Sequence, residues 1–249
     1  GGGGYIGRRL VEALARDPGG VERIVSTDVR PPPPPEQVKG VVYEVADVRS
    51  TDLAAAFRRH GTELVVHLAA IVTPGPGSTR ALEHEVDVVG SRRVTLACVA
   101  AGVRKLVYTS SGAAYGYHAD NPEWIDEEDA LRGNVAFAYS DHKRQVEELL
   151  AEHRRTHPEL LQLVFRPGAI LGARTRNQIT ALFEGRFVLG LRGSQSPFVF
   201  IEDRDVVGAI LRGIHHGGCG TFNLAGDGTL SMREIAALVP DCRVGLAPH

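Results

Sequence analysis

The chain has 249 residues, of which 43% are hydrophobic and 23% are charged, and its formal net charge at pH 7 is −2. These proportions are typical of a folded globular protein and exclude a disordered or fibrous chain. Because there is no basic excess to neutralise phosphates, we expect no nucleic-acid partner.

The cysteines and the apolar runs bear on cellular location. Cys98, Cys219 and Cys242 are odd in number, widely spaced and without a CxxC pair, which favours a reducing cytoplasm over a disulfide framework. No run of about 18 apolar residues occurs, so we expect no membrane-spanning segment. The first residue already lies in a glycine-rich loop of the kind that follows a buried strand. We therefore expect the first strand, and the C-terminal end, to be missing from this sequence.

Short apolar runs rich in β-branched residues alternate with segments whose apolar residues are three and four apart. The runs predict strands at residues 24–27, 41–45, 64–68, 106–109 and 161–165. The periodic segments predict helices at residues 6–15, 53–59, 82–101 and 136–153. Alternating strands and helices favour right-handed crossovers, so we expect an α/β fold with a doubly wound parallel sheet.

A glycine-rich segment opens the chain. Gly1, Gly4 and Gly7 are spaced G-x-x-G-x-x-G and lead into a helix expected to begin near Tyr5 and Ile6. Glycines in such a loop permit a tight turn, close approach of the backbone to a pyrophosphate and close packing of the helix on the sheet. Because the positive helix N-terminus then faces the phosphates, the spacing predicts a dinucleotide site.

An acidic residue supports this interpretation. Asp28 ends the next predicted strand about twenty residues past the loop, where a carboxylate can accept hydrogen bonds from the adenosine ribose. The same carboxylate would repel a 2′-phosphate, so we expect NAD as the cofactor. Arg30 leaves NADP open as the less favoured alternative.

Tyr139 and Lys143 form a Y-x-x-x-K spacing on a predicted helix. Residues four apart share a helix face, so the phenol and the ammonium can point into one cleft. An unperturbed tyrosine has a pKa of about 10, and a nearby cation favours the phenolate needed to accept a proton. The pair is therefore a candidate acid/base centre.

Hydroxyl side chains end a predicted strand next to this helix. Thr109, Ser110 and Ser111 follow an apolar run, and ligands of open α/β sheets bind outside the carboxyl ends of the strands. We expect Ser111 to donate a hydrogen bond to a substrate oxygen.

With these motifs in place, the sequence resembles the extended short-chain dehydrogenase/reductase family, in its NAD-dependent epimerase/dehydratase branch. The resemblance covers most of the chain and implies a Rossmann-like doubly wound sheet with a small C-terminal substrate lobe. Its motifs are Gly1-x-x-Gly4-x-x-Gly7, Asp28, Asp47-Val48-Arg49, His67-Leu68-Ala69-Ala70, Val86-Asp87-Val88-x-Gly90, Thr109-Ser110-Ser111, Tyr139-x-x-x-Lys143 and Arg166-Pro167.

The resemblance implies further cofactor contacts and a division of the chain. The implied contacts are Asp47 and Val48 at the adenine, Leu68, Ala69 and Ala70 along the diphosphate and ribose path, Thr109, and Pro167 with Ile170 on the nicotinamide side. Residues 1–166 would form the NAD-binding domain. Glycines and prolines break the pattern from residue 167 onward, so residues 167–249 would form mainly the substrate lobe, interleaved with the sheet.

The resemblance also implies the catalytic roles. Tyr139 would exchange the proton, Lys143 would hold the nicotinamide ribose and tune Tyr139, and Ser111 would orient the reacting hydroxyl. Hydride would pass between the substrate carbon and the nicotinamide, and an epimerase would return it to the opposite face.

Departures from the family pattern narrow the activity. Gly112 and Ala113 stand where dehydratases of the family carry an Asp-Glu pair, so dehydration is disfavoured. Ser196 and Pro197 stand where sugar-nucleotide epimerases place an arginine for the diphosphate, which leaves Arg192 as the nearest candidate for substrate binding. The family's usual asparagine after the His67 motif is Asp87 here.

The leading interpretation is NAD-dependent oxidation of a sugar-nucleotide hydroxyl, as in 4-epimerisation. The first alternative is an NAD(P)-dependent dehydrogenase or reductase of a steroid-like or other apolar alcohol, and an alternative of another class is a non-catalytic dinucleotide-binding regulator. The family resemblance implies a homodimer through the helices at 82–101 and 136–153.

Other polar clusters are interpreted as structural. The segment from His215 to Cys219 offers only a partial ligand set, so we expect no metal site. Glu202, Asp203 and Asp205 match the acidic first turn and cap of a helix. His142 is expected at the surface, because it points to a different helix face from Lys143.

Overall fold

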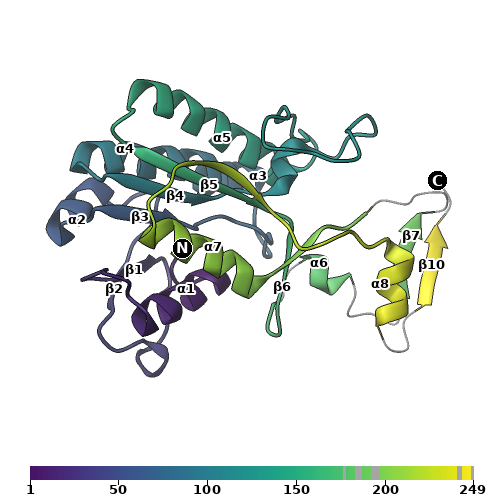
Figure 1. Ribbon diagram of the computed structural model, residues 1–249, viewed down its shortest axis with the longest axis horizontal. Helices are drawn as coiled ribbons and strands as arrows, with labels where there is room; N and C mark the ends of the chain where they lie inside the picture. Colours follow the sequence, from purple (N-terminus) through teal and green to yellow (C-terminus); the bar gives the residue numbers. More distant parts are fainter. Residues whose placement is uncertain (176–177, 183–186, 192–196, 240–242, 248–249) are drawn as a thin grey trace.

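The computed structural model describes residues 1–175, 178–182, 187–191, 197–239 and 243–247 (Figure 1). Its strands are β1 (Val25–Asp28), β2 (Val42–Val45), β3 (Leu64–His67), β4 (Lys105–Thr109), β5 (Leu161–Pro167), β6 (Ala169–Leu171), β7 (Phe187–Leu191), β8 (Phe200–Glu202), β9 (Gly220–Leu224) and β10 (Arg243–Ala247). Its helices are α1 (Tyr5–Arg16), α2 (Leu53–His60), α3 (Arg80–His84), α4 (Gly90–Ala101), α5 (Ala138–Thr156), α6 (Gln178–Ala181), α7 (Asp203–His215) and α8 (Met232–Leu238). Shorter turns are η1 (Pro34–Glu36), the π-turn η2 (Glu85–Val89) and η3 (Gly112–Tyr115).

Parallel strands form the centre of the molecule, which confirms the expected α/β fold. One sheet has the order β3-β4-β5-β9, and β1 pairs in parallel with β2. The register places Thr109 beside Phe165 and Phe165 beside Phe222, so β4, β5 and β9 end at one edge. Ligands of open parallel sheets bind at this edge.

In the described residues, the β1–β2 pair and the main sheet are not joined by strand hydrogen bonds. The glycine loop lies between the carboxyl ends of β1 and β3. The amide of Gly2 donates to the carbonyl of Thr27 at 3.0 Å, and a Cβ on Gly1 would lie 2.4 Å from the amide nitrogen of Ala69. The loop backbone, rather than a strand ladder, therefore links the β1–β2 pair to the main sheet.

Helices cover both faces of the main sheet (Figure 1). The core on one face combines Leu106 and Tyr108 of β4 with residues of α2, α4 and α5, and the core on the other face combines Val107 with residues of α1 and α7. Successive strand residues point to opposite faces, so β4 contributes to both cores and is a continuous apolar run. Within the described ranges, no helix is long and apolar enough to cross a membrane.

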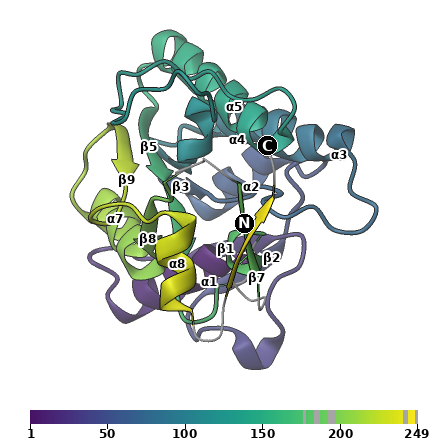
Figure 2. The same ribbon diagram turned by 90° about the vertical axis from the view of Figure 1, so that its right-hand side faces the viewer.

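The chain after residue 167 contributes to two places. β9 extends the main sheet and α7 packs on α1, whereas α8 packs on the parallel pair of β7 and β10 at the far end of the molecule (Figures 1 and 2). β6 pairs in parallel with β8 between these two places. The division at residue 167 into a cofactor domain and a substrate lobe stays a prediction.

The helical segment expected over residues 82–101 contains an irregularity. It begins at Arg80, and Thr79 caps it by accepting from the amide of Leu82 at 3.2 Å. Five residues form the π-turn η2, within which Asp87 is buried. Such turns inside helices often lie at functional sites, because they redirect one side chain.

A buried ion pair joins α5 to β5. Arg166 donates from Nη2 to Glu147 Oε2 at 2.7 Å and from Nε to the same oxygen at 2.9 Å, and both side chains are buried. Ser110 donates to Glu147 Oε1 at 2.5 Å, and Arg166 Nη1 donates to the Tyr115 hydroxyl at 2.6 Å. These bonds fix α5 against the carboxyl ends of β4 and β5.

The same network holds the segment of residues 116–137, which connects η3 to α5. The Tyr115 hydroxyl donates to the carbonyl of Asp126 at 2.8 Å, and Arg166 donates to the carbonyl of Glu127 at 3.1 Å. The amide of Asn223, on β9, donates to the Glu127 carboxylate at 2.6 Å. A long segment without helix or strand is thus tied to η3 and to two strands of the sheet, β5 and β9.

Replacing Arg166 with Met should leave the Glu147 carboxylate buried without its partner. Removal of one partner of a buried pair costs about 3–5 kcal/mol, and we expect the free energy of unfolding to fall by that amount in urea denaturation. Arg104→Met is the control, because its bond to Glu63 at 2.5 Å lies at the surface and contributes far less. Equal losses in the two variants would contradict the role assigned to the buried pair.

Candidate active site

The glycine loop is built for close backbone approach. The amide of Gly4 donates to the carbonyl of Gly1 at 3.2 Å, which closes a tight turn. A Cβ on Gly7 would lie 2.3 Å from the Gly1 carbonyl oxygen and 2.7 Å from the Cα of Gly2, so α1 packs directly on the loop. A cradle of bare backbone at a helix N-terminus fits a pyrophosphate, as the spacing predicts.

Asp28 lies at the carboxyl end of β1 against this loop. Its Oδ2 accepts from the amide of Gly3 at 3.0 Å, and its Oδ1 accepts from the amide of Arg30 at 3.1 Å. A carboxylate has further lone pairs on both oxygens, so these bonds orient Asp28 while leaving capacity for ribose hydroxyls. Asp28 thus lies at the end of a strand beside the loop, as expected, and its contact with the ribose stays a prediction.

The first turn of α1 is anchored by a residue at the start of α7. Tyr5 donates its hydroxyl to Asp203 Oδ2, and Arg9 bonds Asp203 Oδ1 at 2.9 Å. Asp203 does start α7, but its buried side chain spans to α1 instead of capping its own helix. The side chain of Tyr5 is therefore engaged away from the loop, and Tyr5 can serve a phosphate site only through its backbone.

The expected adenine and diphosphate contacts lie along the same edge. Asp47 follows β2 and forms an ion pair with Arg49 at 2.6 Å. Val48 packs directly against Gly90, where an added Cβ would lie only 2.6 Å from the Cγ2 of Val48. Leu68, Ala69 and Ala70 follow β3 next to Gly1. Pro167 ends β5, and Ile170 lies on β6 with its side chain against the core that contains Val107 and residues of α1 and α7.

His67, which opens the motif after β3, is structural. Its Nε2 lies 2.8 Å from the Ser91 hydroxyl, and the side chain is buried. Burial lowers the pKa of His67 to about 3, so the ring is neutral at physiological pH.

Lys143 lies at the carboxyl end of β4. Its Nζ donates to the carbonyl of Thr109 at 2.9 Å and to the hydroxyl of Tyr108 at 3.1 Å, and it lies 5.7 Å from the centre of the Tyr139 ring. Burial lowers the pKa of Lys143 to about 8, and the negative charges of Asp87 and Glu147 oppose that effect. The side chain thus remains an ammonium at neutral pH.

Tyr139 lies one turn before Lys143 on α5, and the structure brings the two together as predicted. Burial raises the pKa of Tyr139 to about 12, and a hydrogen bond with Ser111 opposes that rise. Ser111 also accepts from the amide of Ala113 at 3.1 Å, which caps η3. The resting form is a neutral phenol that bonds Ser111, with the ammonium of Lys143 5.7 Å from the centre of its ring.

Two aromatic side chains extend from the Tyr139 ring toward the surface. The ring centres of Phe137 and Tyr139 are 6.1 Å apart, and those of Tyr117 and Phe137 are 6.2 Å apart. Tyr117 is 69% exposed and Phe137 is 42% exposed. This aromatic row, Tyr117-Phe137-Tyr139, runs from the Tyr139 ring to the surface, and Tyr117 and Phe137 were not among the residues predicted from the sequence.

One expected residue lies outside the described residues, and one expectation was wrong. Arg192, the candidate for substrate binding, falls in the undescribed range 192–196. His142 is not a surface residue: its side chain is 2% exposed and contacts Asp87. The prediction considered helix periodicity alone, whereas α3 and η2 pack over that face of α5.

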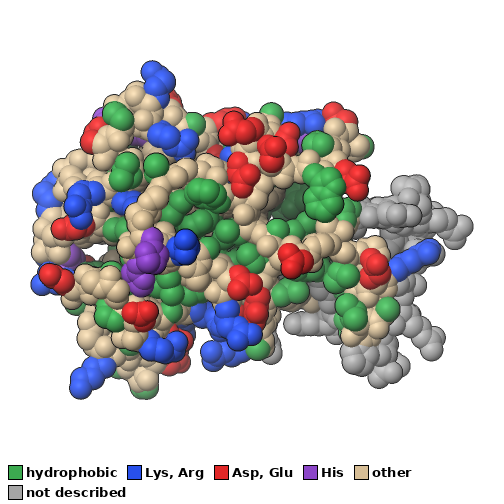
Figure 3. Space-filling view, viewed as in Figure 1, with side chains coloured by type: hydrophobic (Ala, Val, Ile, Leu, Met, Phe, Trp, Pro, Cys, Tyr) green, Lys and Arg blue, Asp and Glu red, His purple; other side chains and the backbone are tan. Residues whose placement is uncertain are grey.

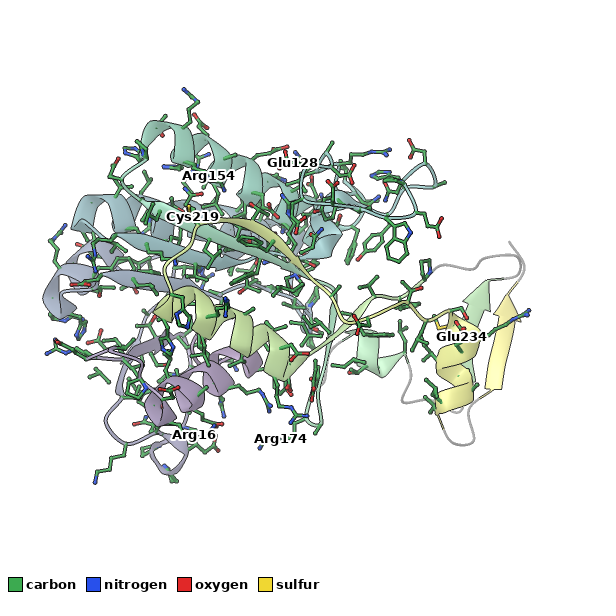
Figure 4. The ribbon with its side chains drawn as sticks, viewed as in Figure 1. Arg16, Glu128, Arg154, Arg174, Cys219 and Glu234 are labelled. Atoms are coloured by element: carbon green, nitrogen blue, oxygen red, sulfur yellow. The ribbon has the colours of Figure 1, made fainter. Side chains whose placement is uncertain are left out.

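The histidines and the cysteine near the end of α7 do not come together as a set of metal ligands. His215 and His216 stack edge to face at 6.3 Å, and the exposed Cys219 lies just before β9 (Figure 4). Among the described residues, no group of three or more His, Cys, Asp or Glu side chains is arranged to hold a metal.

Comparison with known proteins gives a consistent pattern. The model of the NAD dependent epimerase/dehydratase family matches residues 1–225. An uncharacterized protein of Mycobacterium bovis is 24% identical over 234 residues, covering 92% of this chain and 62% of that protein, so the chain spans less than two thirds of this relative. The 3 beta-hydroxysteroid dehydrogenase/Delta 5-->4-isomerase of vaccinia virus is 29% identical over 152 residues, covering 60% of this chain and 44% of that protein.

Solved structures agree with this pattern. The UDP-glucose 4-epimerase of Thermus thermophilus in complex with NAD superposes with a TM-score of 0.78 at 25% identity, covering 100% of this chain and 85% of that one. The family match extends over most of the sequence and includes the glycine loop, Ser111, Tyr139 and Lys143. The chain belongs to the NAD dependent epimerase/dehydratase family.

Proposed function

We propose that this protein is an NAD-dependent oxidoreductase of the extended short-chain type that oxidises a hydroxyl of a sugar nucleotide, as in 4-epimerisation. The observation that carries the proposal is the hydrogen bond between Tyr139 and Ser111, with the Lys143 ammonium 5.7 Å from the Tyr139 ring at the carboxyl end of β4. The likeness to a UDP-glucose 4-epimerase supports the substrate class.

The residues present fit an NAD molecule. The backbone cradle of Gly1, Gly4 and Gly7 would receive the pyrophosphate, and Asp28 would accept from the adenosine ribose and disfavour a 2′-phosphate. The further residues proposed to line its path are Asp47, Val48, Leu68, Ala69, Ala70, Thr109, Pro167 and Ile170. When bound, the nicotinamide supplies the hydride acceptor.

The side chains of this chain supply the proton chemistry. Ser111 and Tyr139 receive the substrate hydroxyl. Tyr139 Oη takes the hydroxyl proton while a hydride leaves the carbon that bears this hydroxyl. The phenol must first ionise, and the Lys143 ammonium favours the phenolate through its positive charge. Lys143 would also donate to a ribose hydroxyl of NAD, a role supported by its bond to the Thr109 carbonyl at the strand end.

Replacing Tyr139 with Phe should abolish turnover, because the ring stays in place while the proton acceptor is lost. We expect kcat to fall by at least about 100-fold, with the NAD dissociation constant from calorimetry changed little. Ser78→Ala serves as a control, because its hydroxyl bonds Glu83 at 2.8 Å, away from the phenol. Substantial turnover by Tyr139→Phe would refute the proposed chemistry.

A second candidate activity is the oxidation of an apolar alcohol, and the aromatic row favours it. Trp124 and Val135 belong to the same segment as Tyr117 and Phe137 and are 76% and 73% exposed. Figure 3 shows hydrophobic side chains at the surface on the side of the molecule where this segment lies. The likeness to a 3 beta-hydroxysteroid dehydrogenase supports the same class of substrate.

The two candidates differ in their products and in their dependence on Phe137. An epimerase is redox-neutral, whereas a dehydrogenase accumulates NADH, which nicotinamide absorbance detects. For an apolar alcohol, Phe137→Ala should raise KM about 10-fold through lost burial, while Phe137→Leu should raise it less. If Phe137→Ala leaves the KM of every apolar alcohol unchanged, the aromatic row does not bind substrate.

The assembly and location of the protein stay predictions. A homodimer through α4 and α5 is proposed from the family resemblance, and light scattering that finds a monomer at micromolar concentration would contradict it. Turnover of any substrate by the pure protein would exclude the alternative of a non-catalytic dinucleotide-binding regulator. The cytoplasmic location proposed from the cysteines is untested.

A further inference from the structure

A buried carboxylate and a buried imidazole meet at the part of α5 that carries Tyr139 and Lys143. His142 Nδ1 lies 3.1 Å from Asp87 Oδ2, and the two side chains are 2% and 6% exposed. Removing a carboxylate from water is costly unless hydrogen bonds or charges compensate it. An asparagine at this position could make hydrogen bonds of the same geometry without that cost, so the negative charge itself calls for an explanation.

Asp87 joins two parts of the candidate active site. Its Oδ1 accepts from the amide of Ile71 at 2.8 Å, directly after the Leu68-Ala69-Ala70 segment. Its Oδ2 bonds His142, the residue before Lys143 on α5. One carboxylate therefore links the segment proposed to line the cofactor path to the helical turn that carries the proposed proton-transfer pair.

His142 is held on its other side as well. The ring of His84, on α3, lies edge to face with it at 5.5 Å and 78°. On the neighbouring position of α5, Asp141 bonds Arg80 at 3.1 Å and Arg144 at 2.8 Å. The N-terminal part of α5 is thus fixed by contacts to α3 and η2, and the ion pair at Glu147 holds the helix further along.

We propose that Asp87 and His142 are positioning residues that hold the N-terminal part of α5 on the Leu68–Ile71 segment and place a negative charge near Lys143. Given the proposed roles of Tyr139 and Lys143, on which this inference rests, the charge keeps Lys143 in its ammonium form when the site is filled. A hydrogen bond from an uncharged side chain would hold the turn but would not favour the ammonium form of Lys143.

The charges around Lys143 give the sign of the effect. The titratable groups that face it are Asp87 from η2, Glu147 and Tyr139 from α5, Tyr108 from β4 and His67 from β3. Asp87 and Glu147 raise the pKa of Lys143, and Asp87 also raises the pKa of Tyr139. Removal of the Asp87 charge should therefore lower the pKa of Lys143 and the pKa of Tyr139.

The test is Asp87→Asn in the otherwise unchanged chain. The amide oxygen can still accept from Ile71 and the amide nitrogen can still donate to the imidazole, so the variant removes the charge and keeps the shape. We expect the pH at which NAD affinity declines, measured by calorimetry, to fall by about one unit, and the pH profile of kcat/KM to move in the same direction. The melting temperature should change little.

Glu83→Gln is the matched control, because Glu83 is a buried carboxylate on the adjoining helix that accepts from Ser78. It should leave the pH profile of NAD affinity in place. If Asp87→Asn also leaves that profile in place, the proposed charge effect is wrong. This readout needs no substrate, so a failure of the proposed activity would not be confused with a failure of this inference.

The positioning effect has its own test at His142. His142→Asn keeps a hydrogen-bonding nitrogen near the position of Nδ1, whereas His142→Phe keeps a ring and loses the bond. We expect Phe to lower kcat about 10-fold or more and Asn to restore most of that loss, with KM changed less than kcat. Equal kcat values in the Phe variant and the unchanged protein would overturn the positioning role.

Discussion

The ion pair between Glu147 and Arg166 is the interaction on which the geometry of this molecule depends. It fixes α5 against β5, receives the hydroxyl of Ser110 at the end of β4, and through Tyr115 reaches the segment of residues 116–137. The negative charge of Glu147 also raises the pKa of Lys143, which lies one helical turn earlier on α5. A single buried carboxylate thus fixes the position of α5 and, together with Asp87, favours the ammonium form of Lys143.

Local regularity made much of the fold and of the site predictable. Buried parallel strands are continuous apolar runs, so β3, β4 and β5 were found within one or two residues of their ends. The glycine loop, Asp28 and the Tyr139–Lys143 spacing are short-range patterns whose chemistry requires particular residue types. The structure places these residues together because parallel strands end at a common edge.

Contacts between distant parts of the chain were beyond such patterns. Tyr5 and Asp203 are separated by 198 positions, and Asp87 and His142 by 55, so no periodicity in either helix signals the bond. The sequence places Asp203 in the acidic first turn of its own helix, where the structure has it. Nothing in that local pattern signals that its side chain bonds Tyr5 and Arg9 of α1. His142 was placed at the surface because the π-turn that brings Asp87 over α5 has no clear signature in a single sequence.

Trp124 is the only tryptophan of the 249 residues, and it is exposed on the segment that borders the aromatic row. Indole emission depends on the polarity around the ring, and here no second indole contributes a background. The fluorescence of the native chain is consequently an intrinsic probe of this one segment. Contacts made there by any small molecule can be followed without attaching a dye or altering a residue.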